Sequence, residues 1–277
     1  MDINWLETIL YGIVSGLTEF MPVSSQAHQV MLRSLLGLDG VSHLLNLFIH
    51  IGMLAGLFIG FGNTISELYR QYKLGSGGRR RRKRNPDLQA LYDIQFVRAA
   101  IIPLLIGFFV YPTARKWTDT VPWTVVFLLL NGIILHVPMY LARGNKDSRS
   151  MTAIDGTLFG FASALSILPG ISRIGVGSSF SVSRGADPQH AFKWSLLLSI
   201  PALIGWIGFD LYGIVSVGLA GADIVFLLQC MLGCGTALVG AVLSVKLVMA
   251  IVQNNGFVNF SYYCWGAALF IFILYLY

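Results

Sequence analysis

Long apolar runs recur along the whole chain and set the strongest limit on its fold. Several approach the roughly 20 residues that an α-helix needs to cross the hydrocarbon core of a bilayer. Of the 277 residues, 55% are hydrophobic and 12% are charged, which gives far more apolar surface than one soluble core needs. The runs do not alternate in polarity, as the strands of a membrane β-barrel would. We therefore expect an all-α integral membrane protein with six transmembrane helices, at residues 44–62, 96–111, 121–142, 189–212, 222–250 and 260–277.

The formal charge of +6 is carried largely by the run GSGGRRRRKRNPD at residues 75–87. Beside transmembrane helices, such a run is typical of a cytoplasmic loop near anionic lipid. Aromatic residues that would indicate specific nucleic-acid binding are not interleaved with it. We therefore expect no nucleic-acid partner, and we place residues 79–84 in the cytoplasm, within a flexible basic linker at 71–95.

Counting helices outward from this loop gives a consistent topology. The segment that follows the run at 121–142 is again basic, with Lys146 and Arg149, as a cytoplasmic loop should be. The next segment is too broken by LPGISRIG to span, and we expect a re-entrant hairpin there. We interpret residues 1–277 as one membrane domain. Its parts are the start of a first repeat at 1–70, the linker at 71–95, a helix pair at 96–150 and a second repeat at 151–277.

Two proline-containing motifs predict that these repeats are related. EFMPVSS at 19–25 aligns with SILPGIS at 166–172, which places Ser25 over Ser172. About thirty residues further on, IHIGMLAG and LSIPALIG also correspond. The topology then makes the copies inverted, each with one re-entrant helix hairpin. Broken half-helices at corresponding positions in two halves point to a polar site at the repeat interface.

The groups that converge there predict an anion site, with phosphate as the natural ligand. Two half-helix N-termini, at about Ser24 and Ser172, would direct unpaired N–H groups and positive dipole ends at one place. Arg173 adds a guanidinium that can bind phosphate oxygens in a bidentate manner. A buried Arg173–Glu19 ion pair is the structural alternative, and it too would mark a site.

The first motif also carries a candidate nucleophile and base. Ser25 and His28 are three residues apart, a spacing that lets their side chains meet on one helix face. This spacing does not decide which of the two attacks phosphorus. His50, which follows the first motif, is expected either to bond to a neighbouring helix or to line the cavity wall.

Both motifs resemble signature sequences of a known family. GLTEFMPVSSQAH resembles EGLTEFLPVSSTGH of the undecaprenyl-pyrophosphate phosphatases, the bacitracin-resistance proteins, and LPGISRIG resembles their PGxSRSG. In topology the likeness extends over essentially the whole chain. It implies six spanning helices, two re-entrant hairpins, and a multi-pass protein of the bacterial plasma membrane. The implied activity is removal of the terminal phosphate of undecaprenyl diphosphate outside the cytoplasm, which recycles the lipid carrier for cell-wall synthesis.

The resemblance also implies roles for individual residues. The expected catalytic residues are Glu19, Ser25, His28 and Arg173, and the expected phosphate-binding residues are Ser24, Gly170, Ser172 and Arg173. Glu19 would position either the base or a divalent cation, Mg²⁺ or Ca²⁺.

Three positions depart from the family pattern. Ser15 stands where the family has a first glutamate, and Ile174 and Gly177 replace hydroxyl residues of the second motif. A single carboxylate predicts weaker cation binding than a pair would give. The alternative function is a polyprenyl-phosphate transporter or flippase, or a catalytically weakened homologue, since inverted repeats that meet at mid-membrane are typical of transporters. The sequence leaves open whether the protein forms a homodimer.

Overall fold

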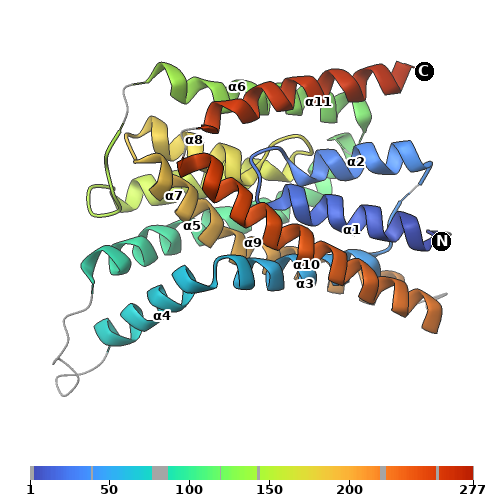
Figure 1. Ribbon diagram of the computed structural model, residues 1–277, viewed down its shortest axis with the longest axis horizontal. Helices are drawn as coiled ribbons and strands as arrows, with labels where there is room; N and C mark the ends of the chain where they lie inside the picture. The colour runs from blue at the N-terminus through green and yellow to red at the C-terminus, as the bar shows by residue number, and fades with distance from the viewer. Residues whose placement is uncertain are drawn as a thin grey trace.

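A computed structural model describes residues 3–38, 40–76, 87–118, 120–141, 144–218, 223–253 and 256–276, and within them the chain is helical. Figure 1 shows long helices that cross the molecule beside several shorter ones. The helices are α1 Trp5–Glu19, α2 Ser25–Leu36, α3 His43–Gly60, α4 Gly62–Ser76, α5 Leu88–Thr118, α6 Val121–His136, α7 Ala153–Ala164, α8 Arg173–Ser183, α9 Pro188–Val217, α10 Ile224–Gln253 and α11 Asn259–Leu276. Short 3-10 turns follow α6 at Val137–Tyr140 and α7 at Leu165–Ile167, and Gly256–Val258 precedes α11.

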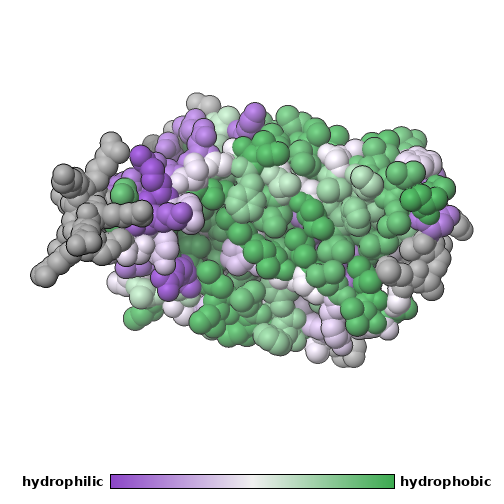
Figure 2. All heavy atoms as spheres, turned by 90° about the horizontal axis from the view of Figure 1, so that it is seen from below, coloured by the Kyte–Doolittle hydropathy of each residue, from purple (hydrophilic) through white to green (hydrophobic). Residues whose placement is uncertain are grey.

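Six helices in the described part of the chain are long and apolar enough to cross a membrane. They are His43–Gly60, Leu88–Ala114, Val121–Tyr140, Pro188–Val217, Ile224–Gln253 and Asn259–Leu276. Each overlaps one predicted run, which confirms the all-α fold with six candidate membrane spans. Their outer faces carry exposed apolar side chains such as Phe109 and Val215. The view in Figure 2 shows this apolar surface over the middle of the molecule, with hydrophilic residues gathered toward one end. Such a surface fits lipid tails rather than water.

The linker predicted at 71–95 is partly helical. Helix α4 continues to Ser76 and α5 already begins at Leu88, well before residue 96. Asp87 caps the start of α5, because its carboxylate accepts the N–H of Gln89 at 2.9 Å. The linker-like composition of this segment concealed the cap. The basic residues 79–84 lie outside the described residues, so their cytoplasmic placement stays a prediction.

Two hairpins of short helices stand at the positions where the sequence predicts re-entrant segments. One is formed by α1 and α2, the other by α7 and α8. Both begin with a capping box, made by Asn4 with Glu7 in α1 and by Thr152 with Asp155 in α7. Their insertion into a membrane from opposite sides remains a prediction.

The second helix of each hairpin begins at a serine cap. Ser24 accepts the N–H of Ala27 and Ser172 accepts that of Gly175. Along the chain, Ser24 is as far from the first cap Asn4 as Ser172 is from the first cap Thr152. The helix starts therefore match Ser24 with Ser172, one residue away from the predicted alignment of Ser25 with Ser172, because the two connecting loops differ in conformation.

Glycines bring α1 into close contact with α10, which crosses it in Figure 1. A methyl group added at Gly16 would collide with the backbone carbonyl of Ala237. One added at Gly12 would collide with the side chain of Thr236. Helix α1 ends at Glu19, so this backbone contact fixes where along α10 the first hairpin loop begins.

We expect Gly16→Ala to destabilise the folded protein. Overpacking costs about 1–3 kcal/mol, which exceeds the gain of about 1 kcal/mol that alanine brings to a helix. Gly235→Ala is the matched control on α10, because nothing lies within 4 Å of the added carbon. In thermal melting of the detergent-solubilised protein, Gly16→Ala should lower Tm while Gly235→Ala leaves it unchanged or raises it. Equal Tm values for both variants would contradict the close approach of α1 and α10.

Candidate functional site

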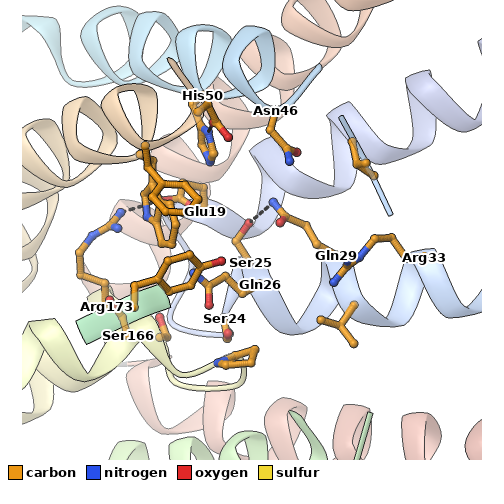
Figure 3. Close-up of a pocket in the computed structure, with 18 of the residues that line it drawn as sticks. Glu19, Ser24, Ser25, Gln26, Gln29, Arg33, Asn46, His50, Ser166 and Arg173 are labelled. Carbon is orange, nitrogen blue, oxygen red and sulfur yellow. Dashed lines mark hydrogen bonds and ion pairs between the residues drawn. The ribbon is translucent and has the colours of Figure 1, made fainter. Parts of the chain in front are cut away.

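The loops of the two hairpins meet beside a polar cavity inside the helix bundle (Figure 3). Five of the predicted site residues line it: Glu19, Ser24, Ser25, Ser172 and Arg173. Helices α2, α3 and α9 add the polar lining residues Gln26, Gln29, Arg33, His43, Asn46, His50 and Asp210. The cavity therefore combines groups from both halves of the chain.

Direct hydrogen bonds join the two loops. The N–H of Gly170 donates to Oγ of Ser24 at 3.1 Å, and Oγ of Ser172 donates to the carbonyl of Met21 at 3.2 Å. Gly170 has φ +123, and a Cβ there would lie 2.6 Å from Cβ of Phe127, so only glycine fits. The N–H of Gly170 is thus used to hold the first hairpin, and Gly170 is absent from the residues that line the cavity.

Asn131 of α6 holds both loops from outside. Its Nδ2 donates to the carbonyl of Pro22 at 2.9 Å, and its Oδ1 accepts the N–H of Ser172 at 2.9 Å. The side chain is fully buried, so each of these bonds satisfies a group that has no access to water. Asn131 therefore ties the two hairpin loops to α6.

The start of α2 is held in an unusual backbone conformation. Ser24 has φ 66 and ψ 99, and among the described residues it is the one non-glycine residue with positive φ. Its side-chain oxygen accepts from both Ala27 and Gly170, so local and long-range bonds stabilise this conformation. Such conformations persist where the surroundings over-determine them, and they cluster at functional sites.

A buried ion pair links the hairpins at the cavity wall. Nη2 of Arg173 lies 2.6 Å from Oε1 of Glu19, and the two side chains are 7% and 12% exposed. The ion pair that the sequence offered as an alternative is therefore present. It uses one of the five guanidinium donors. The buried Nε of Arg173 has no hydrogen-bond partner among the described residues, so donor capacity remains for an anion.

Ser25 is the first residue of α2 and its hydroxyl belongs to a small polar cluster. Oγ donates to the carbonyl of Ser15 at 3.2 Å and accepts from Nε2 of Gln29 at 3.4 Å. Nε2 of Gln29 also donates to Oγ of Ser15 at 3.1 Å. The backbone carbonyl of Ser15 thus positions the Ser25 hydroxyl at the N-terminus of α2, while the Ser15 side chain bonds to Gln29.

His28 does not bond to Ser25, although the spacing of the two residues allows it. Its Nδ1 lies 2.8 Å from the carbonyl of Ser24, and its Nε2 lies 2.8 Å from the hydroxyl of Tyr263 on α11. The ring also stacks on Tyr263, and His28 is absent from the cavity lining. Helical spacing located both residues correctly on α2, but it could not show that α11 supplies partners for the imidazole.

The sequence analysis missed a second polar group, on α3 and α9. Asp210 has its carboxylate between two imidazoles, with Nδ1 of His43 3.1 Å from Oδ1 and Nδ1 of His50 2.7 Å from Oδ2. A signal was present, because Asp210 interrupts an apolar transmembrane run, where an ionisable residue is costly and usually functional. The expectation that His50 bonds to a neighbouring helix or lines the cavity is confirmed in both parts.

As the side chains are arranged, Glu19 offers a divalent cation only a poor site. Hard cations need several oxygen ligands, and carboxylates are the strongest of them. Glu19 and Asp210 line the cavity, but Glu19 is engaged by Arg173 and Asp210 by two histidines. Within the described residues, no group of three or more histidine, cysteine, aspartate and glutamate side chains could hold a metal ion. The cation at Glu19 stays a prediction, and no chemical step below depends on it.

Replacing Ser15 with glutamate tests this point. Positions 15 and 19 are one turn apart on α1, with Cβ atoms about 5–6 Å apart, so Ser15→Glu would create a pair able to share one cation. In a Mg²⁺ titration of phosphate release, we expect the half-maximal concentration to be lower for Ser15→Glu than for the wild type. Superimposable curves, or a wild type that is indifferent to chelator, would mean that Glu19 serves only as the partner of Arg173.

Comparison with known proteins gives one consistent family. The sequence profile described as "Bacitracin resistance protein BacA" matches residues 8–270. The chain is 29% identical to an undecaprenyl-diphosphatase of Methanobrevibacter smithii, over 99% of this chain and 98% of that protein. It is also 29% identical to an undecaprenyl-diphosphatase of Carboxydothermus hydrogenoformans, over 98% and 97% of the two chains. A protein named undecaprenyl-diphosphatase 3 of Bacillus cereus matches with the same identity and coverage.

Proposed function

The chain belongs to the bacitracin resistance protein family, and we propose that it hydrolyses the terminal phosphate of undecaprenyl diphosphate. The observation that carries this proposal is the meeting of two hairpin loops at a polar cavity, with a serine hydroxyl on one side and an arginine on the other. The relatives' shared name supplies the substrate, and the cavity supplies groups that suit phosphoryl transfer.

The cavity offers three kinds of donor to a diphosphate. Arg173 has guanidinium N–H groups beyond the one bonded to Glu19. The first N–H groups of α2 and α8 are unpaired within their helices and carry the positive ends of the helix dipoles. Gln29 adds a side-chain amide beside Ser25. Donors held in fixed positions stabilise the charge that spreads over the phosphoryl oxygens in the transition state.

Ser25 is the nucleophile in this proposal. Its hydroxyl faces the cavity, while both ring nitrogens of His28 are bonded elsewhere. Attack by Oγ on the terminal phosphorus would form a phosphoserine and release the lipid monophosphate, and water would then free inorganic phosphate. His28 would serve to fix α2 against α11 through Tyr263.

The apolar outer surface allows the lipid tail to remain in the membrane while its headgroup enters the cavity (Figure 2). By the family's role, the reaction would occur in the plasma membrane on its extracytoplasmic side. It would recycle the carrier lipid for cell-wall synthesis and confer resistance to bacitracin, which the family name records.

Three single substitutions test the site. We expect Ser25→Ala and Arg173→Ala to reduce phosphate release from undecaprenyl diphosphate by at least about 100-fold, the scale seen when a nucleophile or a transition-state donor is removed. His28→Ala should mainly lower Tm, since it removes two hydrogen bonds and a stacking contact. Ser183→Ala is the control, because that exposed hydroxyl bonds only to the carbonyl of Phe180.

The assay should compare the purified variants in detergent at equal protein concentration. With no second compartment, a transporter or flippase would release no phosphate, so release by the wild type separates hydrolysis from transport. Unchanged release by Ser25→Ala and Arg173→Ala together would refute the assigned site.

A further inference from the structure

The cluster of His43, His50 and Asp210 has no role in the site described so far. Asp210 is 4% exposed in its side chain, so its charge is almost fully withdrawn from solvent. Its carboxylate contacts two imidazoles of helix α3, while Asp210 itself is on α9. All three residues line the cavity that contains Ser25 and Arg173. A buried carboxylate that orients a histidine in the same cavity as a nucleophile is an arrangement that hydrolytic enzymes use for proton transfer.

His50 is the better oriented of the two histidines. Its Nδ1 is 2.7 Å from Asp210, its side chain is 15% exposed, and its ring stacks on Trp206 at 6.0 Å between centroids. Because Nδ1 is held by the carboxylate, Nε2 is the nitrogen left for chemistry. Nε2 of His50 has no hydrogen-bond partner within the described part of the chain, whereas His28 has partners on both nitrogens.

The position of His50 suits the side of phosphorus opposite Ser25. Figure 3 shows the two side chains on different walls of the cavity, His50 on α3 and Ser25 at the start of α2. In phosphoryl transfer the attacking and leaving oxygens lie roughly in line on opposite sides of phosphorus. If Ser25 attacks from α2, the departing lipid phosphate and later the hydrolytic water both occupy the far side, toward α3.

We propose that His50, positioned by Asp210, is the acid and base of this reaction, a role that rests on the proposed phosphatase function. In the first step the Ser25 oxygen forms a bond to the terminal phosphorus, and the bond from that phosphorus to the bridging oxygen breaks. The electron pair stays with the lipid monophosphate, whose oxygen takes the proton of Nε2. The hydroxyl proton of Ser25 passes to a non-bridging oxygen of the terminal phosphate, and His50 becomes neutral.

The second step returns every group to its starting state. A water molecule at the place of the departed lipid phosphate loses a proton to Nε2 and bonds to the phosphorus. The bond from phosphorus to the Ser25 oxygen breaks, and that oxygen takes back the proton held on the phosphoryl group. Inorganic phosphate leaves, and the imidazolium of His50 is again stabilised by the carboxylate of Asp210.

His50→Asn tests the role while keeping the structural contact. The asparagine amide can still donate to Asp210 in place of Nδ1, but it cannot exchange a proton at the position of Nε2. We expect kcat for phosphate release to fall about 10²–10⁴-fold, the usual contribution of a general acid or base. The second step should suffer most, since water is a poor nucleophile without a base. His136→Asn is the control, because His136 bonds Ser261 on α11 away from the cavity.

Acid quenching with undecaprenyl diphosphate radiolabelled at its terminal phosphate gives the decisive readout. His50→Asn should trap label on the protein at Ser25, whereas the wild type and His136→Asn should trap little. Asp210→Asn should also trap label, and its KM should be unchanged. A rate for His50→Asn within threefold of the wild type, or a slow variant that traps no label, would overturn the role of His50. Phosphate release by the wild type confirms the phosphatase function separately, and its absence would overturn both proposals.

Discussion

The ion pair between Glu19 and Arg173 is the interaction on which the rest of the site depends. Each residue ends or begins a helix of a different hairpin, and neither charge can remain buried without the other. The 2.6 Å contact therefore fixes the two hairpins relative to each other. Removing one partner would leave an unpaired charge in a largely apolar interior and would lower the stability of the fold by about 3–5 kcal/mol.

Around this pair, several backbone groups of the hairpin loops bond to another segment. Asn131 bonds to both loops, and Ser24 and Gly170 bond across them. Irregular backbone inside a membrane protein is tolerated where it is buried in protein or lines a polar cavity, and these loops pack against other segments beside such a cavity. The same bonds that make the loops possible also direct the start of α2 and the side chain of Ser25 toward the cavity.

The features that depend on local sequence could be predicted, whereas those that depend on contacts between distant helices could not. Apolar length predicted the six spans, and prolines near Ser25 and Arg173 predicted the two hairpins, because both are local properties. The partners of His28 and Asp210 were not predictable, since they lie on helices distant in sequence and depend on packing. The start of α5 was missed because a linker composition hid the cap at Asp87.

The central claim is that both hairpins build one phosphate site. A structure of the protein with a methylene-bridged analogue of a polyprenyl diphosphate, which resists hydrolysis, tests it most directly. The account predicts the terminal phosphorus within reach of the Ser25 hydroxyl, with its oxygens bonded to Arg173 and the first N–H groups of α2 and α8. An analogue bound elsewhere, or bound in contact with only one hairpin, would contradict it.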